Sequence, residues 1–108
     1  MTLHEALFAS SAPVERTVKL KLDDGSEVEQ VFYVRELPAI EMRKQVLSEK
    51  SADLGKVEGA LSALIARGIC SDADGTPAMT TAQADKLKPL VAAQLRDLIM
   101  EVNGLGEK

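Results

Sequence analysis

The chain has 108 residues, of which 45% are hydrophobic and 28% are charged. This length and composition fit one compact domain with a single modest core. Its 13 basic and 17 acidic residues give a formal net charge of −4 and are scattered along the sequence. This distribution argues against nucleic-acid binding, because nucleic-acid binders usually concentrate positive charge on one face.

Residues 1–13 are predicted to form a flexible segment ahead of the domain. They include the single histidine, His4, which a mobile segment would not hold in a catalytic geometry. The segment has neither the basic start nor the long apolar run of a secretory signal. No stretch of the chain approaches the ~20 apolar residues of a membrane span. We therefore expect a cytoplasmic protein without membrane contact.

Residues 14–35 are predicted to form an antiparallel β-hairpin. Apolar and charged side chains alternate from Val18 to Leu22, which is the pattern of a half-buried strand. The Asp-Asp-Gly-Ser sequence at 23–26 indicates a turn, in which Gly25 can adopt a positive φ. Because an isolated hairpin is marginally stable in water, this one is expected to pack against other elements.

The second strand of this hairpin is apolar on both faces. Val28, Phe32 and Val34 share one face, which is expected to point to the core. Val31 and Tyr33 lie on the opposite face. A sheet with apolar residues on both faces can leave some of them uncovered for a partner.

Residues 38–103 are predicted to form a bundle of three to four short helices. Pro38 suits the first turn of a helix that ends at about Glu49, because its missing N–H is not needed there. The clearest helical pattern runs from Asp53 to Arg67, and Gly68 is expected to end that helix. Gly55 and Gly59 indicate either close packing or a weak N-terminal half. The apolar stripe consists of Leu54, Val57, Leu61, Leu64 and Ile65.

The last third of the chain begins with the loop Ser-Asp-Ala-Asp-Gly-Thr-Pro at 71–77. Thr80 and Gln83 fit a capping box for a short helix that extends to about Lys88. Pro89 predicts a break before a final helix at about 90–102. Asn103 and Gly104 are typical of a helix end. The prediction is therefore an α+β domain at 14–105, with a two-stranded antiparallel hairpin, a helical part and a short tail at 106–108.

No group of residues has the pattern of a catalytic, cofactor or metal site. Cys70 is the single cysteine, so it excludes an intramolecular disulfide, and such a residue is usually buried. The Asp-x-Asp-Gly loop resembles a calcium loop only in part. With Asp72 as the first ligand, Pro77 and Gln83 occupy the positions of the required glycine and glutamate. A polar turn is the favoured interpretation, and we expect no enzyme.

Three stretches resemble sequences of the tail assembly chaperones of long-tailed bacteriophages and prophages. They are the Val-Arg-Glu-Leu-Pro-Ala-Ile-Glu junction at 34–41, the Asp-x-Asp-Gly segment with its following helix at 69–87, and the Asn-Gly helix end at 98–105. The order and spacing of these stretches extend the resemblance over residues 14–105. Pro89 departs from the family, which more often has Gly or Ser there, so the angle between the last two helices stays open.

The resemblance implies a non-enzymatic role without a cofactor. Such chaperones bind the tape measure protein and keep it soluble while tail tube protein assembles around it. The implied partners are therefore the tape measure and tail tube proteins, with self-association as a further expectation. In many of these phages a longer form arises by a ribosomal frameshift near the end of the short reading frame, and residues 106–108 are compatible with such a site and equally with an ordinary charged tail. A bacterial adaptor domain with another partner is the alternative, followed by a metal-binding module built on the Asp72 loop.

The partner-binding surface is predicted on the second face of the hairpin, at Val31 and Tyr33, together with residues of the final helix. Arg35 and Arg96 are expected to be exposed neighbours of that surface.

Overall fold

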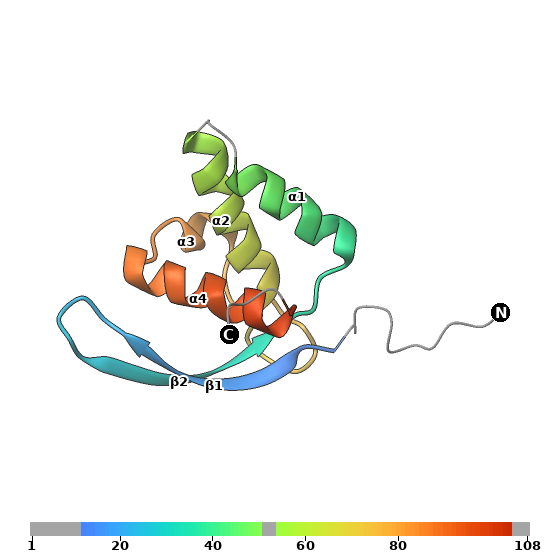
Figure 1. Cartoon of the computed structure of the whole chain (residues 1–108). Helices are drawn as coiled ribbons and strands as arrows, with labels where there is room; N and C mark the ends of the chain where they lie inside the picture. The colour runs from blue at the N-terminus through green and yellow to red at the C-terminus, as the bar shows by residue number, and fades with distance from the viewer. Residues whose placement is uncertain (1–11, 51–53, 105–108) are drawn as a thin grey trace.

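The computed structural model describes residues 12–50 and 54–104. A three-stranded antiparallel sheet lies against one side of a layer of helices (Figure 1). The strands are β1 (Val14–Lys21), β2 (Glu27–Val34) and β3 (Ile69–Cys70). The helices are α1 (Ala39–Glu49), α2 (Leu54–Gly68), α3 (Thr81–Ala84) and α4 (Pro89–Val102). The α+β class is confirmed.

The predicted hairpin forms with an unbroken register from Val14 opposite Val34 to Lys21 opposite Glu27. Gly25 adopts a φ of 88° in the connecting turn, a conformation that favours glycine. Towards the helices the hairpin buries Leu20, Phe32 and Val34. Val28 shares their face but is 42% exposed, since the hairpin tip extends past α4 (Figure 1).

The two-stranded sheet of the prediction is corrected to three strands. β3 follows α2 directly and pairs with β2, placing Cys70 opposite Tyr33 and Ile69 opposite Val34. The Arg35 N–H donates to the Gly68 carbonyl at 2.8 Å and extends this pairing. Two residues are too few to show a period-2 pattern, so the sequence could not reveal this strand.

The predicted helix starts and ends are present in the structure, but one helix is shorter than predicted. The capping box of Thr80 and Gln83 is present, and α4 starts at Pro89 after the predicted break. Gly104 has the left-handed φ of 77° expected at a helix end. The helix predicted to reach Lys88 instead ends at Ala84, after which the chain forms a turn with a Leu87 N–H to Ala84 carbonyl bond of 3.2 Å.

The core lies where α2 and α4 cross above the centre of the sheet. Gly68 is buried against α4, and a Cβ atom at this position would lie 2.8 Å from Ile99 Cδ1. Cys70 is also buried, as predicted. No described helix is long and apolar enough to cross a membrane. The side chains buried most completely are Val34, Leu64, Ile65, Ile69, Cys70, Leu95 and Ile99.

Candidate partner-binding surfaces

The Asp72 loop is a self-contained turn. Asp72 Oδ1 accepts hydrogen bonds from the backbone N–H groups of Asp74 at 3.0 Å and Thr76 at 3.1 Å. The bond from Thr76 is the main cause that holds the pKa of Asp72 below its ordinary value. The described residues contain no group of three or more His, Cys, Asp or Glu arranged to hold a metal ion. The two hydrogen bonds to its carboxylate show that Asp72 stabilises its own loop, as a polar turn requires.

Arg35 anchors this loop to the sheet. Its Nη2 donates to the Gly75 carbonyl at 2.7 Å and lies 3.9 Å from Cys70 Sγ. Gly75 has a φ of 88°, and a Cβ atom there would lie 2.7 Å from Arg35 Nη2. The close approach of the guanidinium therefore requires glycine at position 75. The sequence predicted Arg35 as an exposed neighbour of the partner-binding surface. In the structure it is half-buried and holds the loop.

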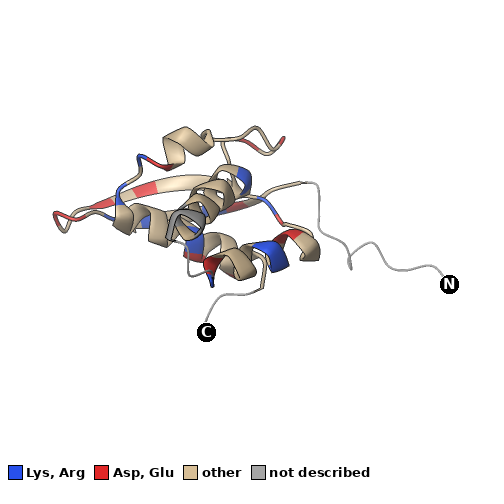
Figure 2. Cartoon of the chain, turned by 90° about the horizontal axis from the view of Figure 1, so that it is seen from above, with Lys and Arg blue, Asp and Glu red and all other residues tan. Residues whose placement is uncertain are grey.

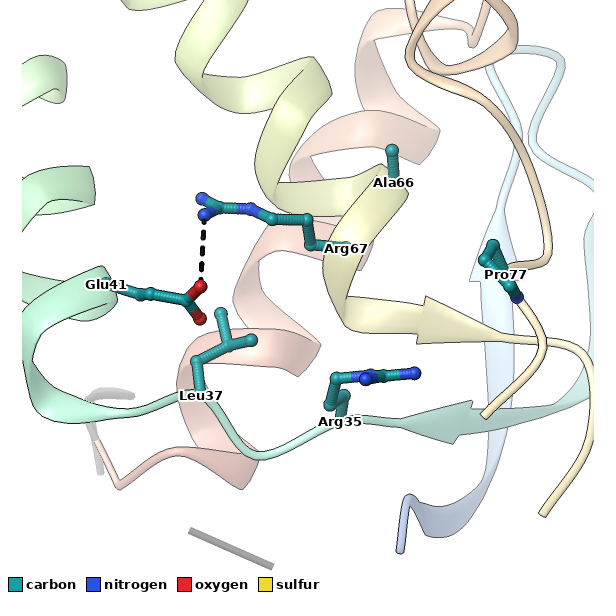
Figure 3. A pocket seen from close by; sticks show the side chains of 6 residues that line it. All are labelled: Arg35, Leu37, Glu41, Ala66, Arg67 and Pro77. Atoms are coloured by element: carbon teal, nitrogen blue, oxygen red, sulfur yellow. Dashed lines mark ion pairs between the residues drawn. The ribbon is translucent and has the colours of Figure 1, made fainter. Parts of the chain in front are cut away.

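A hollow of about 270 Å³ lies between the start of α1, the end of α2 and the sheet (Figure 3). Glu41 and Arg67 face each other across it in an ion pair of 3.8 Å. Both side chains of this pair are more than one third exposed, so the pair contributes little to stability. The walls also include Arg35, Leu37, Ala66 and Pro77. The walls of the hollow therefore combine charged and apolar side chains.

The open face of the sheet carries the two predicted contact residues. Val31 is 45% exposed and Tyr33 is half-buried. Around them the face is mainly charged, because Lys19 lies opposite Glu29 and Lys21 opposite Glu27. The apolar part of this face is therefore small.

Arg96 belongs to a different part of the molecule. It forms two hydrogen bonds with the Glu49 carboxylate, from Nη2 to Oε1 at 2.6 Å and from Nε to Oε2 at 3.1 Å. Gln45 donates to the same carboxylate at 2.9 Å. This cluster joins α4 to α1 within the helical layer, so the structure does not bring Arg96 together with Val31 and Tyr33. In Figure 2 acidic and basic residues are interspersed over helices and strands, without a side of one sign in this view.

A larger groove of about 580 Å³ lies between α2, α3 and the start of α4. It exists because α3 is only one turn long and the chain breaks before Pro89. At its margin Gly59 is exposed, and a Cβ atom built on it meets nothing within 4 Å. Gly59 therefore leaves space open, and the predicted alternative of close packing is wrong at this position. Six of the lining residues are apolar: Leu61, Ile65, Ala84, Leu87, Pro89 and Ala92.

Sequence reasoning placed Leu61 and Ile65 in a core stripe but did not find this groove. The only local signals for it were Gly59 and the Pro89 break, and neither indicates which helices meet there. The groove is larger than the hollow at Glu41 and Arg67, and more apolar residues line it.

Comparison with known proteins identifies the family of this chain. The family model described as phage tail assembly chaperone matches residues 2–103. The chain belongs to the phage tail assembly chaperone family. No curated protein and no solved structure matches it. The matched residues include nearly the whole domain of this chaperone, with both the sheet and the groove.

The three stretches that carry the sequence resemblance meet at one end of this chaperone. Arg35 of the first bonds to Gly75 of the second. Asn103 of the third accepts from the Leu37 N–H at 2.7 Å and donates to the Arg35 carbonyl at 3.3 Å. These stretches therefore build the joint between sheet and helices, and the second stretch also supplies Ala84, Asp85 and Leu87 to the groove.

Proposed function

We propose that this chaperone binds the tape measure protein of a phage tail in the host cytoplasm and keeps it soluble during tail tube assembly. Family membership supports a role in tail assembly. A tape measure protein is long and helical, so its exposed apolar helix faces need cover before the tube encloses them. The role proposed is one of binding without catalysis.

The observation that carries the contact proposal is the apolar groove between α2, α3 and α4. Its volume of about 580 Å³ and its six apolar lining residues suit the apolar face of one amphipathic helix, a common mode of peptide recognition. Ser62 and Asp85 at its walls supply polar groups that could orient such a helix. The open sheet face with Val31 and Tyr33 stays a second prediction for the contact surface, with Arg35 and Arg96 as the charged neighbours first expected.

Gly59 offers a test that keeps the fold intact. Gly59→Gln places a side chain in the open margin of the groove, and it raises helix propensity because Gln is a better helix former than Gly. We expect co-expression with wild-type chaperone to bring a tape measure fragment into the soluble fraction and Gly59→Gln to bring at least several-fold less. Gly59→Ala is the matched control, since it gives the propensity gain with a methyl group alone and should retain activity.

The outcomes separate the function from the surface. A fragment that stays insoluble with wild-type chaperone would reject the proposed function. Wild-type activity of Gly59→Gln, combined with loss in Val31→Thr, would move the contact to the open sheet face. Thr is suited to a strand, so Val31→Thr removes apolar surface without breaking β2.

A further inference from the structure

Within residues 12–50 and 54–104, no strand pairs with the outer edge of β1. In the sheet order β1-β2-β3, β1 pairs with β2 alone. In an antiparallel pair, every second residue points its N–H and carbonyl groups towards the neighbouring strand. The residues between them point theirs to the opposite edge. The Leu22 N–H donates to the Ser26 carbonyl of the opposite strand at 2.8 Å, so the even-numbered residues of β1 point to β2. The odd-numbered residues Glu15, Thr17, Lys19 and Lys21 therefore present their N–H and carbonyl groups to the outer edge.

One end of this edge is already covered from within the chain. The Gln94 side chain of α4 accepts from the Lys21 N–H at 2.9 Å and donates to the Lys21 carbonyl at 2.8 Å. Arg16 Nη1 donates to the Glu15 carbonyl at 3.1 Å, a contact of an exposed side chain that a stronger partner can displace. Among the described residues, none outside the strand pair bonds to the backbone of Thr17 or Lys19. The open edge thus runs from 15 to 19.

We propose that this edge pairs antiparallel with the same edge of a second copy of the chain, about a two-fold axis at Thr17. The two Thr17 residues then face each other, and Glu15 of each copy lies opposite Lys19 of the other. All three facing pairs can exchange backbone hydrogen bonds, because the groups concerned already point outward. The two three-stranded sheets become one continuous sheet, and two opposite-charge contacts form on its open face. This dimer does not depend on the proposed function.

The charges of β1 select this register over its neighbours. An axis at Glu15, Arg16 or Lys19 would place that charged residue opposite its own copy, and directly opposed like charges destabilise a strand pair. An axis at Val18 would place Glu15 opposite Lys21, whose backbone groups are occupied by Gln94. Only the axis at Thr17 uses the open positions and places opposite charges together.

The ends of the strand fit the same register. Lys21 would lie opposite Pro13 of the second copy, and proline has no N–H to donate. Gln94 therefore bonds to the backbone of Lys21 at the position where the partner strand has no N–H to donate. On the helix-facing side, half-buried Val14 would lie opposite buried Leu20, and exposed Arg16 opposite half-buried Val18, so one charged side chain of each copy lies among apolar ones at the seam.

Charge exchange tests the register directly by sedimentation equilibrium of the full chain over a concentration series. The wild type should approach twice the chain mass of 11.6 kDa. Glu15→Lys should raise the dimer Kd by about tenfold or more, because it converts two attractive contacts to repulsive ones. Glu15→Lys/Lys19→Glu should recover most of this loss, since the opposite charges then face each other in reversed order.

Two controls make the result specific. Glu27→Lys changes charge by the same amount in β2, away from the open edge, and should leave the dimer Kd unchanged. Circular dichroism checks that every variant keeps the fold, since Lys19→Glu lies opposite Glu29 and Glu27→Lys lies opposite Lys21 within the hairpin, where like charges oppose each other. A wild type that stays monomeric at all concentrations would overturn the proposal. So would a dimer with the wild-type Kd in Glu15→Lys, or a double variant as weak as the single one.

Discussion

At the scale of single residues, small side chains and amides set the close contacts of this fold. Gly68 allows Ile99 to approach the end of α2, and Gly75 allows Arg35 to reach a loop carbonyl. Asn103 bonds simultaneously to the chain before α1 and to the Ile99 carbonyl of its own helix at 2.8 Å. Each of these residues joins segments that lie far apart in the sequence.

Gly68→Ala is expected to destabilise the protein by about 1–3 kcal/mol. The added Cβ atom would lie 2.8 Å from Ile99 Cδ1 and 3.0 Å from Cγ1, and overpacking of a buried site costs about this much. Ile99→Val removes the Cδ1 atom, at a cost of about 0.5–1.5 kcal/mol by itself. The double variant should therefore lose less free energy of unfolding than the sum of the single losses, measured by urea denaturation. Additive losses would show that the two side chains do not collide.

At the scale of elements, α4 is held by side chains along its whole length. Gln94 attaches it to β1, Asn103 attaches its end to the chain before α1, and Arg96 attaches it to the end of α1. α1 has fewer attachments, since its buried side chains are Met42 and Gln45. The cluster of Arg96, Glu49 and Gln45 is therefore a main link between α1 and the rest of the molecule.

Glu49→Gln is expected to lower the free energy of unfolding by about 1 kcal/mol at neutral pH, because it removes a charged hydrogen-bond acceptor from a partly exposed pair. Burial acts to raise the pKa of Glu49, but hydrogen bonds from Arg96 and Gln45 outweigh it, so the pKa lies below its ordinary value. A depressed pKa stabilises the fold above the ordinary carboxyl range, and this contribution is lost as the pH falls through the folded-state value.

The difference between wild type and Glu49→Gln should therefore shrink in acid, as followed by denaturation at a series of pH values. Glu41→Gln is the control, because its pair with Arg67 is longer and more exposed and should change stability by less than about 0.5 kcal/mol. An equal difference at neutral and acidic pH would mean that the Glu49 charge contributes nothing to the link.

The elements themselves were largely predictable, and their joints were not. Strand alternation, the capping box and Pro89 are local sequence signals. The structure has the strands, the capped helix and the break at the predicted positions. β3 was missed because Ile69 and Cys70 are too few for a pattern. The contacts of Arg35 with Gly75 and of Arg96 with Glu49 span 40 and 47 residues, so no local pattern contains them. The groove at Gly59 depends on how three helices meet, which also lies beyond local signals.

At the scale of the whole molecule, the burial pattern divides the chaperone into a firm part and a weaker one. The firm part combines the sheet with α2 and α4, and it contains all the side chains that are buried most completely. α1 lies against α2 and exposes Ile40 at 56% and Leu47 at 65%. Regions with few buried apolar contacts open at lower free energy than the core.

We therefore expect the amides of α1 to exchange with deuterium at least about tenfold faster than those in the second half of α4, measured by mass spectrometry at neutral pH. The second half of α4 buries Leu95, Leu98, Ile99 and Met100, whereas α1 depends on two buried side chains and the Glu49 link. Glu49→Gln should speed exchange in α1 further and leave α4 unchanged, since only α1 loses a main attachment. Equal rates in α1 and α4 would contradict this division and show that the domain opens as one cooperative unit.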